Sequence, residues 1–401
     1  MKALLRPWIV VLLAHLVYVG AVLARNGGDP MSLVKVGETV CTGYDGQFTY
    51  FIALDPAPAA AAPHLDVPAY RYQRILLPLL ARAAALGRAD LIPWTILLIN
   101  LAAQTMGTAV VALLLRDMKV SQWVALVYGL WPGLMVSVRT EIAEPLSYGL
   151  IAAAYFADRR ERVWPSALLF GLATFAKETA LLFVVAQIAS VILSGAQCGR
   201  EEEASAGNFQ RMLNGKTDGP PLSAFPFSIR WKSNPSHNSF RGLSTLIHNR
   251  RLLALIALVV LPFALWQFLL WRTFGALGLG SGGCLGTPFE IIPFMGVWRI
   301  AMISLPAFFL FSLFLFPWFI FPSLWGIAAS AGEVLRRNWH PYVWALGANA
   351  ALIPFTPFST FREPVAMLRF GTGLVLATIL FGGLVKSRRV LNYSWFWLAM
   401  I

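Results

Sequence analysis

An aspartate among aromatic residues follows the first hydrophobic segment of the chain. Residues 43–53 read GYDGQFTYFIA, which places Asp45 between Tyr44 and a turn-forming glycine, with the amide of Gln47 two positions further on. A carboxylate in this setting could accept a proton from a hydroxyl group, or it could cap a helix that begins before Gln47. We expect Asp45 to be the catalytic base of a site at a membrane surface.

Further ionisable residues, expected at or near the ends of helices, could complete such a site. An arginine or lysine would stabilise a phosphate as it leaves, best when the contact is bidentate and partly desolvated. Besides Tyr44 and Gln47, the residues that we expect around Asp45 are Arg71, Arg74, Glu141, Glu144, Lys177, Glu178, Arg362 and Arg369.

These residues also have interpretations that involve no chemistry. Arg71 and Arg74 are next to tyrosines, which is typical of anchors at a membrane surface. Glu141 and Glu144 share one face of a predicted helix start, where acidic side chains are favoured anyway. Arg362 could belong to an ordinary loop pair. The sequence alone leaves both interpretations open for each of them.

The composition is that of a membrane protein with several spans. The chain has 401 residues, of which 58% are hydrophobic and 13% charged, whereas soluble proteins carry about 25% charged residues. Its net charge of +13 comes mostly from lysines and arginines in segments that we expect in the cytoplasm. The basic charge therefore needs no nucleic-acid partner to explain it.

Hydrophobic runs of helical length predict an all-α bundle of about ten transmembrane helices with both termini in the cytoplasm. The first run is interpreted as a retained helix, with a cleaved signal peptide as the alternative. An N-terminal module, 1–195, includes the first outer loop, 25–90, in which residues 75–86 are expected to lie at the interface. A polar cytoplasmic loop, 196–250, precedes a C-terminal module, 251–401. The expected spans are 7–24, 91–115, 122–138, 142–157, two within 164–193 that meet at Lys177, 251–271, 302–325, 342–358 and 365–385.

Loop residues outside the main motifs carry weaker signals. Asp55 and Asp66 come just before prolines and are interpreted as turn residues. Cys41 and Cys284 fall in loops expected on the same outer face, so a disulfide between them is open, although two lone cysteines are a weak signal. No Cys/His spacing indicates a zinc site. The sequence implies no cofactor and leaves a divalent cation undecided.

The expected ionisable residues gather on one side of the membrane. A transporter or flippase of a lipid-linked intermediate would need ionisable groups near the bilayer midplane, often on discontinuous helices. An enzyme that acts on a lipid-anchored substrate would need them at one interface. The predicted layout favours the enzyme, and the transporter is the main alternative.

Three short motifs in the first 195 residues resemble the GT-C superfamily of membrane glycosyltransferases. The nearest likeness is to the mannosyltransferases of glycosylphosphatidylinositol-anchor assembly and their prokaryotic relatives, which carry an aromatic-Asp-Gly element and then Ile-Ala, as in residues 44–53. Residues 141–146 look like their acidic-Pro-Leu element, and residues 176–180 sit where they have a polar turn between helices. The chain departs from the eukaryotic pattern with Gln47-Phe48 in place of a His-containing pair.

The resemblance implies a bundle with interfacial helices in the first outer loop and an essential acid in that loop, which Asp45 matches. It also implies a polyprenyl- or dolichyl-phosphate-linked sugar donor, with inversion at the anomeric carbon. We therefore expect transfer of a sugar, with mannose as one candidate, to a hydroxyl of a glycan, lipid or protein acceptor. The site would face outside in a multi-pass protein of the plasma membrane, among membrane lipids and without nucleic acid.

Overall fold

The computed structural model describes residues 6–195, 250–279, 283–284 and 286–400, and these residues form helices and no strands. The all-α prediction is therefore confirmed. The predicted polar loop 196–250 lies, except for its last residue, outside the described residues. The α-helices are α1 (Pro7–Arg25), α2 (Met31–Val34), α3 (Gly46–Leu54), α4 (Pro58–Ala61), α5 (Pro68–Tyr72), α6 (Leu76–Ala84), α7 (Ile92–Asp117), α8 (Ala125–Gly129), α9 (Pro132–Arg139), α10 (Glu144–Arg159), α11 (Val163–Ala176), α14 (Leu261–Phe274), α15 (Met295–Ile303), α16 (Leu305–Leu315), α17 (Phe321–Leu335), α18 (Pro341–Leu352), α19 (Phe358–Arg362), α20 (Pro364–Phe370), α21 (Thr372–Leu384) and α22 (Arg388–Ser394).

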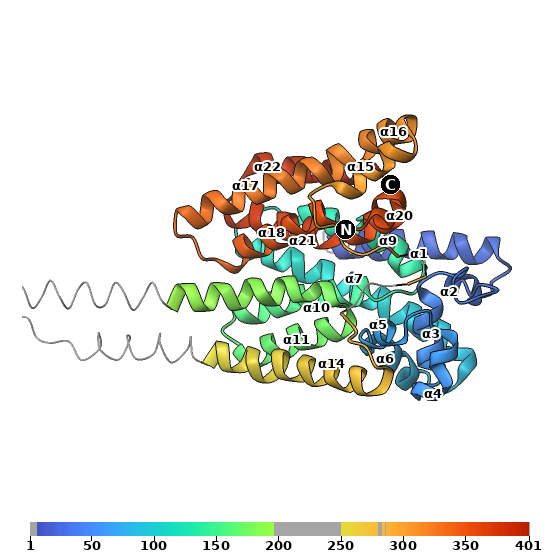
Figure 1. Cartoon of the computed structure of the whole chain (residues 1–401). Coiled ribbons are helices and arrows are strands. Elements are labelled where there is room, and N and C mark those ends of the chain that lie inside the picture. The colour runs from blue at the N-terminus through green and yellow to red at the C-terminus, as the bar shows by residue number, and fades with distance from the viewer. Residues whose placement is uncertain (1–5, 196–249, 280–282, 285, 401) are drawn as a thin grey trace, which may run out of the picture.

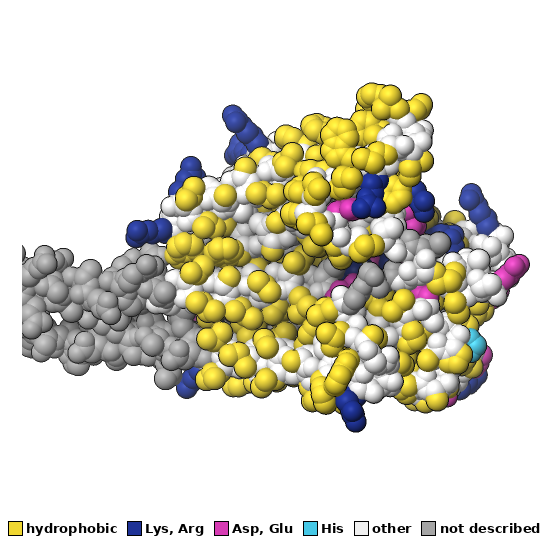
Figure 2. All heavy atoms as spheres, in the orientation of Figure 1, with side chains coloured by type: hydrophobic (Ala, Val, Ile, Leu, Met, Phe, Trp, Pro, Cys, Tyr) yellow, Lys and Arg dark blue, Asp and Glu magenta, His cyan; other side chains and the backbone are white. Residues whose placement is uncertain are grey.

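Several helices are long and apolar enough to cross a membrane, so the chain is a membrane protein. Within the described residues, 5 helices meet this criterion, and a sixth span results if the bent pair α20–α21 counts as one. Hydrophobic side chains cover most of the visible flank of the bundle (Figure 2). The 5 helices are Pro7–Arg25, Ala89–Asp117, Glu178–Gly195, Arg250–Phe274 and Leu305–Leu335.

The structure does not confirm the count of about ten spans, because some expected spans are interrupted or short. Residues 122–138 form the short helices α8 and α9 instead of one helix, and Pro132 begins α9 after a break. Residues 164–193 do form two helices that meet at Lys177, whose backbone is extended between α11 and the helix Glu178–Gly195. Proline and an extended residue both interrupt the hydrogen-bond ladder of a helix.

Residues 25–90, which we predicted as the first outer loop, include a cap of short helices, α2 to α6, at one end of the bundle (Figure 1). Helix α6 covers most of the segment 75–86 that we expected at the interface, and Arg82 donates hydrogen bonds to the carbonyls of Ala53 and Leu54 at the end of α3. At the start of α3, a Cβ on Gly46 would lie 2.2 Å from the carbonyl oxygen of Thr140. Glycine therefore lets α3 begin directly against the end of α9.

A disulfide joins this cap to the C-terminal half of the chain. Cys41 and Cys284 are bonded across 243 positions, with their Cα atoms 5.6 Å apart. The question that the sequence left open is thus answered by a covalent link between the first outer loop and the loop before α15.

Candidate functional site

Asp45 lies between two arginines from distant parts of the chain. Its Oδ1 accepts from Arg71 Nη1 at 3.1 Å, and its Oδ2 accepts from Arg369 Nη2 at 2.7 Å. The side chain makes no capping hydrogen bond to α3, although Asp45 immediately precedes that helix. The capping interpretation of Asp45 is therefore wrong, and the carboxylate points into an ionic cluster.

Arg369, in α20, connects Asp45 to a second carboxylate. Its Nε donates to Glu144 Oε1 at 2.9 Å, and its Nη1 donates to the hydroxyl of Tyr44 at 3.1 Å. Lys177 Nζ lies 2.5 Å from the same Glu144 oxygen. Glu144 is the first residue of α10, Lys177 directly follows α11 and Arg369 lies in the last turn of α20, so these ion pairs gather three helix ends around one point.

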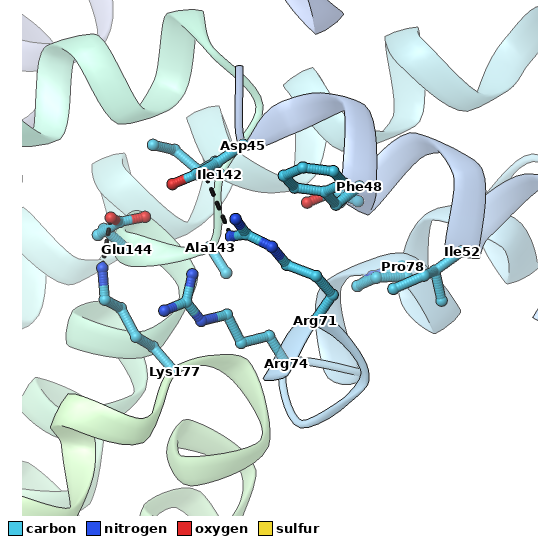
Figure 3. A pocket seen from close by; sticks show the side chains of 11 residues that line it. Asp45, Phe48, Ile52, Arg71, Arg74, Pro78, Ile142, Ala143, Glu144 and Lys177 are labelled. Carbon is cyan, nitrogen blue, oxygen red and sulfur yellow. Dashed lines mark hydrogen bonds and ion pairs between the residues drawn. The ribbon is translucent and has the colours of Figure 1, made fainter. Parts of the chain in front are cut away.

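Arg74 forms the next wall of the cluster. It pairs bidentately with Glu178, at 2.8 Å from Nε to Oε2 and 2.6 Å from Nη2 to Oε1. It also donates to the Tyr70 hydroxyl, and the Tyr70 ring lies 4.4 Å from its guanidinium carbon. In Figure 3, the Arg74 side chain points between Lys177 and Arg71 toward Asp45. Arg74 and Glu178 therefore join the outer loop to the break between α11 and the next helix.

Positive and negative groups balance within this cluster. Buried charges are tolerated when they are paired and hydrogen-bonded. The cluster consists of four cations, Arg71, Arg74, Lys177 and Arg369, and four carboxylates, Asp45, Asp66, Glu144 and Glu178.

The arginines determine the protonation state of Asp45. Burial by itself would raise the pKa of this carboxyl, but the charges of Arg71, Arg369 and Arg74 outweigh burial and hold the pKa well below its usual range. Asp45 is therefore ionised at any physiological pH. A carboxylate that is held this tightly is also a weak base, so proton transfer to it requires that its arginine contacts loosen.

Two large hollows share Asp45 as part of their lining. One, of about 210 Å³, is lined by Arg74, Lys177 and Arg369 together with the apolar side chains of Phe289 and Phe370. The other, of about 420 Å³, is lined by the arginines Arg71 and Arg369 and by polar groups that include Tyr44, Asp66, Ser359, Thr360 and Glu363. A small third hollow, whose lining includes Asp45, Phe48, Ile142 and Glu144, is shown in Figure 3.

The structure therefore brings together most of the residues expected around Asp45, but three lie elsewhere. Gln47 is buried and holds the preceding loop, with Oε1 accepting from the Gly37 amide and Nε2 donating to the Val40 carbonyl. Glu141 is fully buried, and neither carboxyl oxygen has a hydrogen-bond partner among the described residues. Arg362 packs over the Phe358 ring, and its side chain lines none of the three hollows.

Sequence reasoning missed Asp66 as a member of the cluster. Instead of merely shaping a turn, Asp66 binds Arg71 through both carboxylate oxygens, at 2.7 Å and 2.8 Å. The available signal was the spacing of the two residues: Asp66 lies just before α5, and Arg71 follows it by five positions within that helix. Ser359 and Thr360 line both large hollows, and nothing in their sequence context distinguished them.

Comparison of the chain with protein-family models, with curated proteins and with solved structures found no match.

Proposed function

We propose that the chain is an integral membrane glycosyltransferase of the GT-C type that transfers a sugar from a polyprenyl-phosphate donor to an acceptor hydroxyl. The observation that carries this proposal is the position of Asp45 in the lining of both large hollows, of which one has Lys177 and two phenylalanines in its lining and the other has hydroxyl and carboxylate side chains. A lipid phosphate and a sugar acceptor need these two environments, and the reaction needs a carboxylate where they meet.

The hollow beside Lys177 suits the donor. Within the described part of the chain, Lys177 forms one ion pair, so its ammonium keeps donors for a phosphate. Phe289 is 52% exposed at the mouth of this hollow and Phe370 forms part of its wall. These rings offer a surface to the first units of a hydrocarbon chain, while the polar hollow offers hydroxyl and carboxylate partners to a sugar.

In the proposed reaction, the acceptor oxygen bonds to the anomeric carbon as the bond from that carbon to the phosphate oxygen breaks. The electron pair of the broken bond stays on the lipid phosphate, whose charge Lys177, Arg74 and Arg369 stabilise. The acceptor proton passes to Asp45. Attack from the side opposite the phosphate inverts the anomeric centre.

Donor binding also provides a way to activate Asp45. A phosphate beside Arg369 and Arg74 would compete with Asp45 for their guanidinium groups. Since these contacts are what lower the pKa of Asp45, their loosening makes the carboxylate a stronger base. The base would then be strong only when a donor is present, which limits futile reaction with water.

The position of the site relative to the membrane belongs to the same proposal. Disulfides persist in oxidising compartments, so the Cys41–Cys284 bond supports an extracytoplasmic site. We accordingly propose a GT-C-like bundle of about ten spans in the plasma membrane, with both termini in the cytoplasm.

One observation favours a transporter of a lipid-linked intermediate as the second candidate. Helices α20 and α21 form a pair bent by 40°, and Arg369 lies two residues before the bend at Gly371. Discontinuous helices with a charge at the break are typical of transporters. This candidate predicts movement of the intact lipid across the bilayer without sugar release.

Purified protein in nanodiscs and in liposomes, supplied with labelled polyprenyl-phosphate sugars, distinguishes the two candidates. The enzyme transfers the sugar or slowly hydrolyses the donor, and Asp45→Asn lowers this rate by about 10²–10⁴, the usual contribution of a positioned base. The matched control is Asp90→Asn, at an exposed ion pair with Arg88. Activity of Asp45→Asn above a tenth of wild type, or lipid translocation without turnover, contradicts the enzyme.

A further inference from the structure

We infer that Asp66 is a positioning residue that aims Arg71 at Asp45, and that the Cys41–Cys284 disulfide fixes Gly283 and Cys284 against the ion pair of Asp66 and Arg71. The consequence for catalysis rests on the proposed function. The consequence for the geometry of Arg71 does not, so the two can be tested separately.

Asp66 fixes two of the three nitrogens of the Arg71 guanidinium. Its carboxylate accepts from Arg71 Nε at 2.7 Å and from Nη2 at 2.8 Å, and it is itself held by the Val67 amide at 2.7 Å. A guanidinium is planar and rigid, so fixing Nε and Nη2 fixes the direction of Nη1 as well. Nη1 is the atom that donates to Asp45.

Gly283 and Cys284 lie against this ion pair. The Cys284 amide donates to Asp66 Oδ2 at 3.3 Å. Gly283 has a φ of +92°, and a Cβ there would lie 2.8 Å from Asp66 Oδ2 and 3.1 Å from Arg71 Nη2. The glycine backbone thus lies directly against both side chains, in a conformation that a larger residue would strain.

The disulfide holds Gly283 and Cys284 in this place. Cys41 precedes Asp45 by four residues, and both cysteines line the same polar hollow as Asp45, Asp66 and Arg71. Reduction releases Cys284 from the segment that carries Asp45. The disulfide then acts on the Asp45 carboxylate through Asp66 and Arg71. We therefore expect that the effects of reducing the disulfide and of replacing Asp66 are not additive.

The first test needs no enzymatic activity. Phenylglyoxal, which modifies guanidinium groups, is applied to the full-length protein, and the modification of each arginine is followed by peptide mass spectrometry. We expect Asp66→Asn to raise the rate at Arg71 about tenfold, the factor for losing one charge-assisted hydrogen bond. Reduction of the disulfide raises the modification rate of Arg71 in the wild type and causes no further increase in Asp66→Asn. Arg74, paired with Glu178, is the internal control.

The second test measures sugar transfer under oxidising and reducing conditions. Reduction lowers kcat of the wild type but leaves the already low kcat of Asp66→Asn unchanged, a non-additivity that a general loss of stability would not produce. Asp55→Asn is the matched control, because Asp55 belongs to the same segment 25–90 and, among the described residues, accepts a hydrogen bond from the Ala57 amide and forms no ion pair. It keeps both the activity and the sensitivity to reduction.

The outcomes separate the inference from the proposed function. If Arg71 stays protected in Asp66→Asn and after reduction, the inference is wrong even in an active enzyme. If Arg71 responds as expected but no preparation turns over donor, positioning holds and the proposed function fails. Should Asp66→Asn not fold, Gly283→Ala displaces the backbone next to this ion pair while keeping Asp66, and it must expose Arg71 in the same way.

Discussion

Arg369 and Glu144 are 225 positions apart, yet Arg369 Nε donates to Glu144 Oε1 at 2.9 Å. Through this contact, α20 in the C-terminal module meets the first residue of α10 in the N-terminal module. The same guanidinium reaches Asp45 and Tyr44 in the outer loop. One arginine therefore joins three segments that surround the proposed site.

Arg369→Lys tests how far the site depends on the three contacts of this guanidinium group. A lysine ammonium is a point charge and cannot contact Glu144, Asp45 and Tyr44 at once. We expect kcat/KM for donor turnover to fall by about 10²-fold, which is the loss caused by removing one donor from a preorganised site. The matched control is Arg362→Lys, because Arg362 lies seven positions earlier but lines none of the hollows. Equal effects of the two substitutions would contradict the central role of Arg369.

Gly46→Ala tests the packing that places Asp45. The new methyl group would meet the Thr140 carbonyl oxygen at 2.2 Å, so α3 must shift away from α9. We expect a loss of about 1–3 kcal/mol in the free energy of unfolding, as for overpacking in a core, together with lower turnover. Gly332→Ala is the control, since a Cβ there has open space inside α17. It should leave turnover intact and raise the stability of the helix slightly. An unchanged melting temperature in Gly46→Ala would show that this contact is not tight.

The sequence predicted the class of the fold and most members of the ionic cluster, but not their pairing. Charged residues at the ends of apolar runs identified Glu144, Lys177 and Arg369, because helix ends are where a membrane protein can place charge. Asp66 was missed because its local context, an acid before a proline-containing turn, is the same whether or not an arginine donates hydrogen bonds to it. Tertiary contacts decide that choice.

Glu141 is the opposite case to Asp66: its local pattern predicted a place in the site, and the structure puts it elsewhere. Its spacing from Glu144 predicted a shared face at a helix start, yet Glu141 precedes α10 in a left-handed conformation, with φ of 56°, and its side chain is fully buried. Residues that precede a helix do not follow its spacing, so the three-residue separation of Glu141 and Glu144 does not place them on one helix face. The count of about ten spans stays a prediction, because breaks such as that before Pro132 depend on packing and not on local hydropathy.

Glu141→Gln tests the burial of that carboxyl by its effect on stability against pH. Burial raises the pKa of Glu141 well above its ordinary value of 4.5. Below pH 4.5 both folded and unfolded states hold the proton; at higher pH the unfolded state ionises first, and stability falls until the pH passes the raised pKa. The uncharged glutamine side chain avoids this loss. We expect the melting temperature of the variant to exceed that of the wild type by roughly 2–4 °C at pH 8 and to match it near pH 4. A pH-independent difference would contradict this account.

Phe289→Asp tests which hollow receives the lipid. Phe289 lines the cationic hollow and is half exposed, so an aspartate there would repel a phosphate and remove apolar surface from the first prenyl units. We expect the KM for a long-chain donor to rise about tenfold, in line with the free energy of burying one Phe side chain, with a smaller rise for a short-chain donor. Ile292→Asp is the matched control, because Ile292 is exposed in the same segment but lines neither large hollow. A rise in the acceptor KM with an unchanged donor KM would instead place the acceptor beside Lys177 and reverse the proposed assignment of the two hollows.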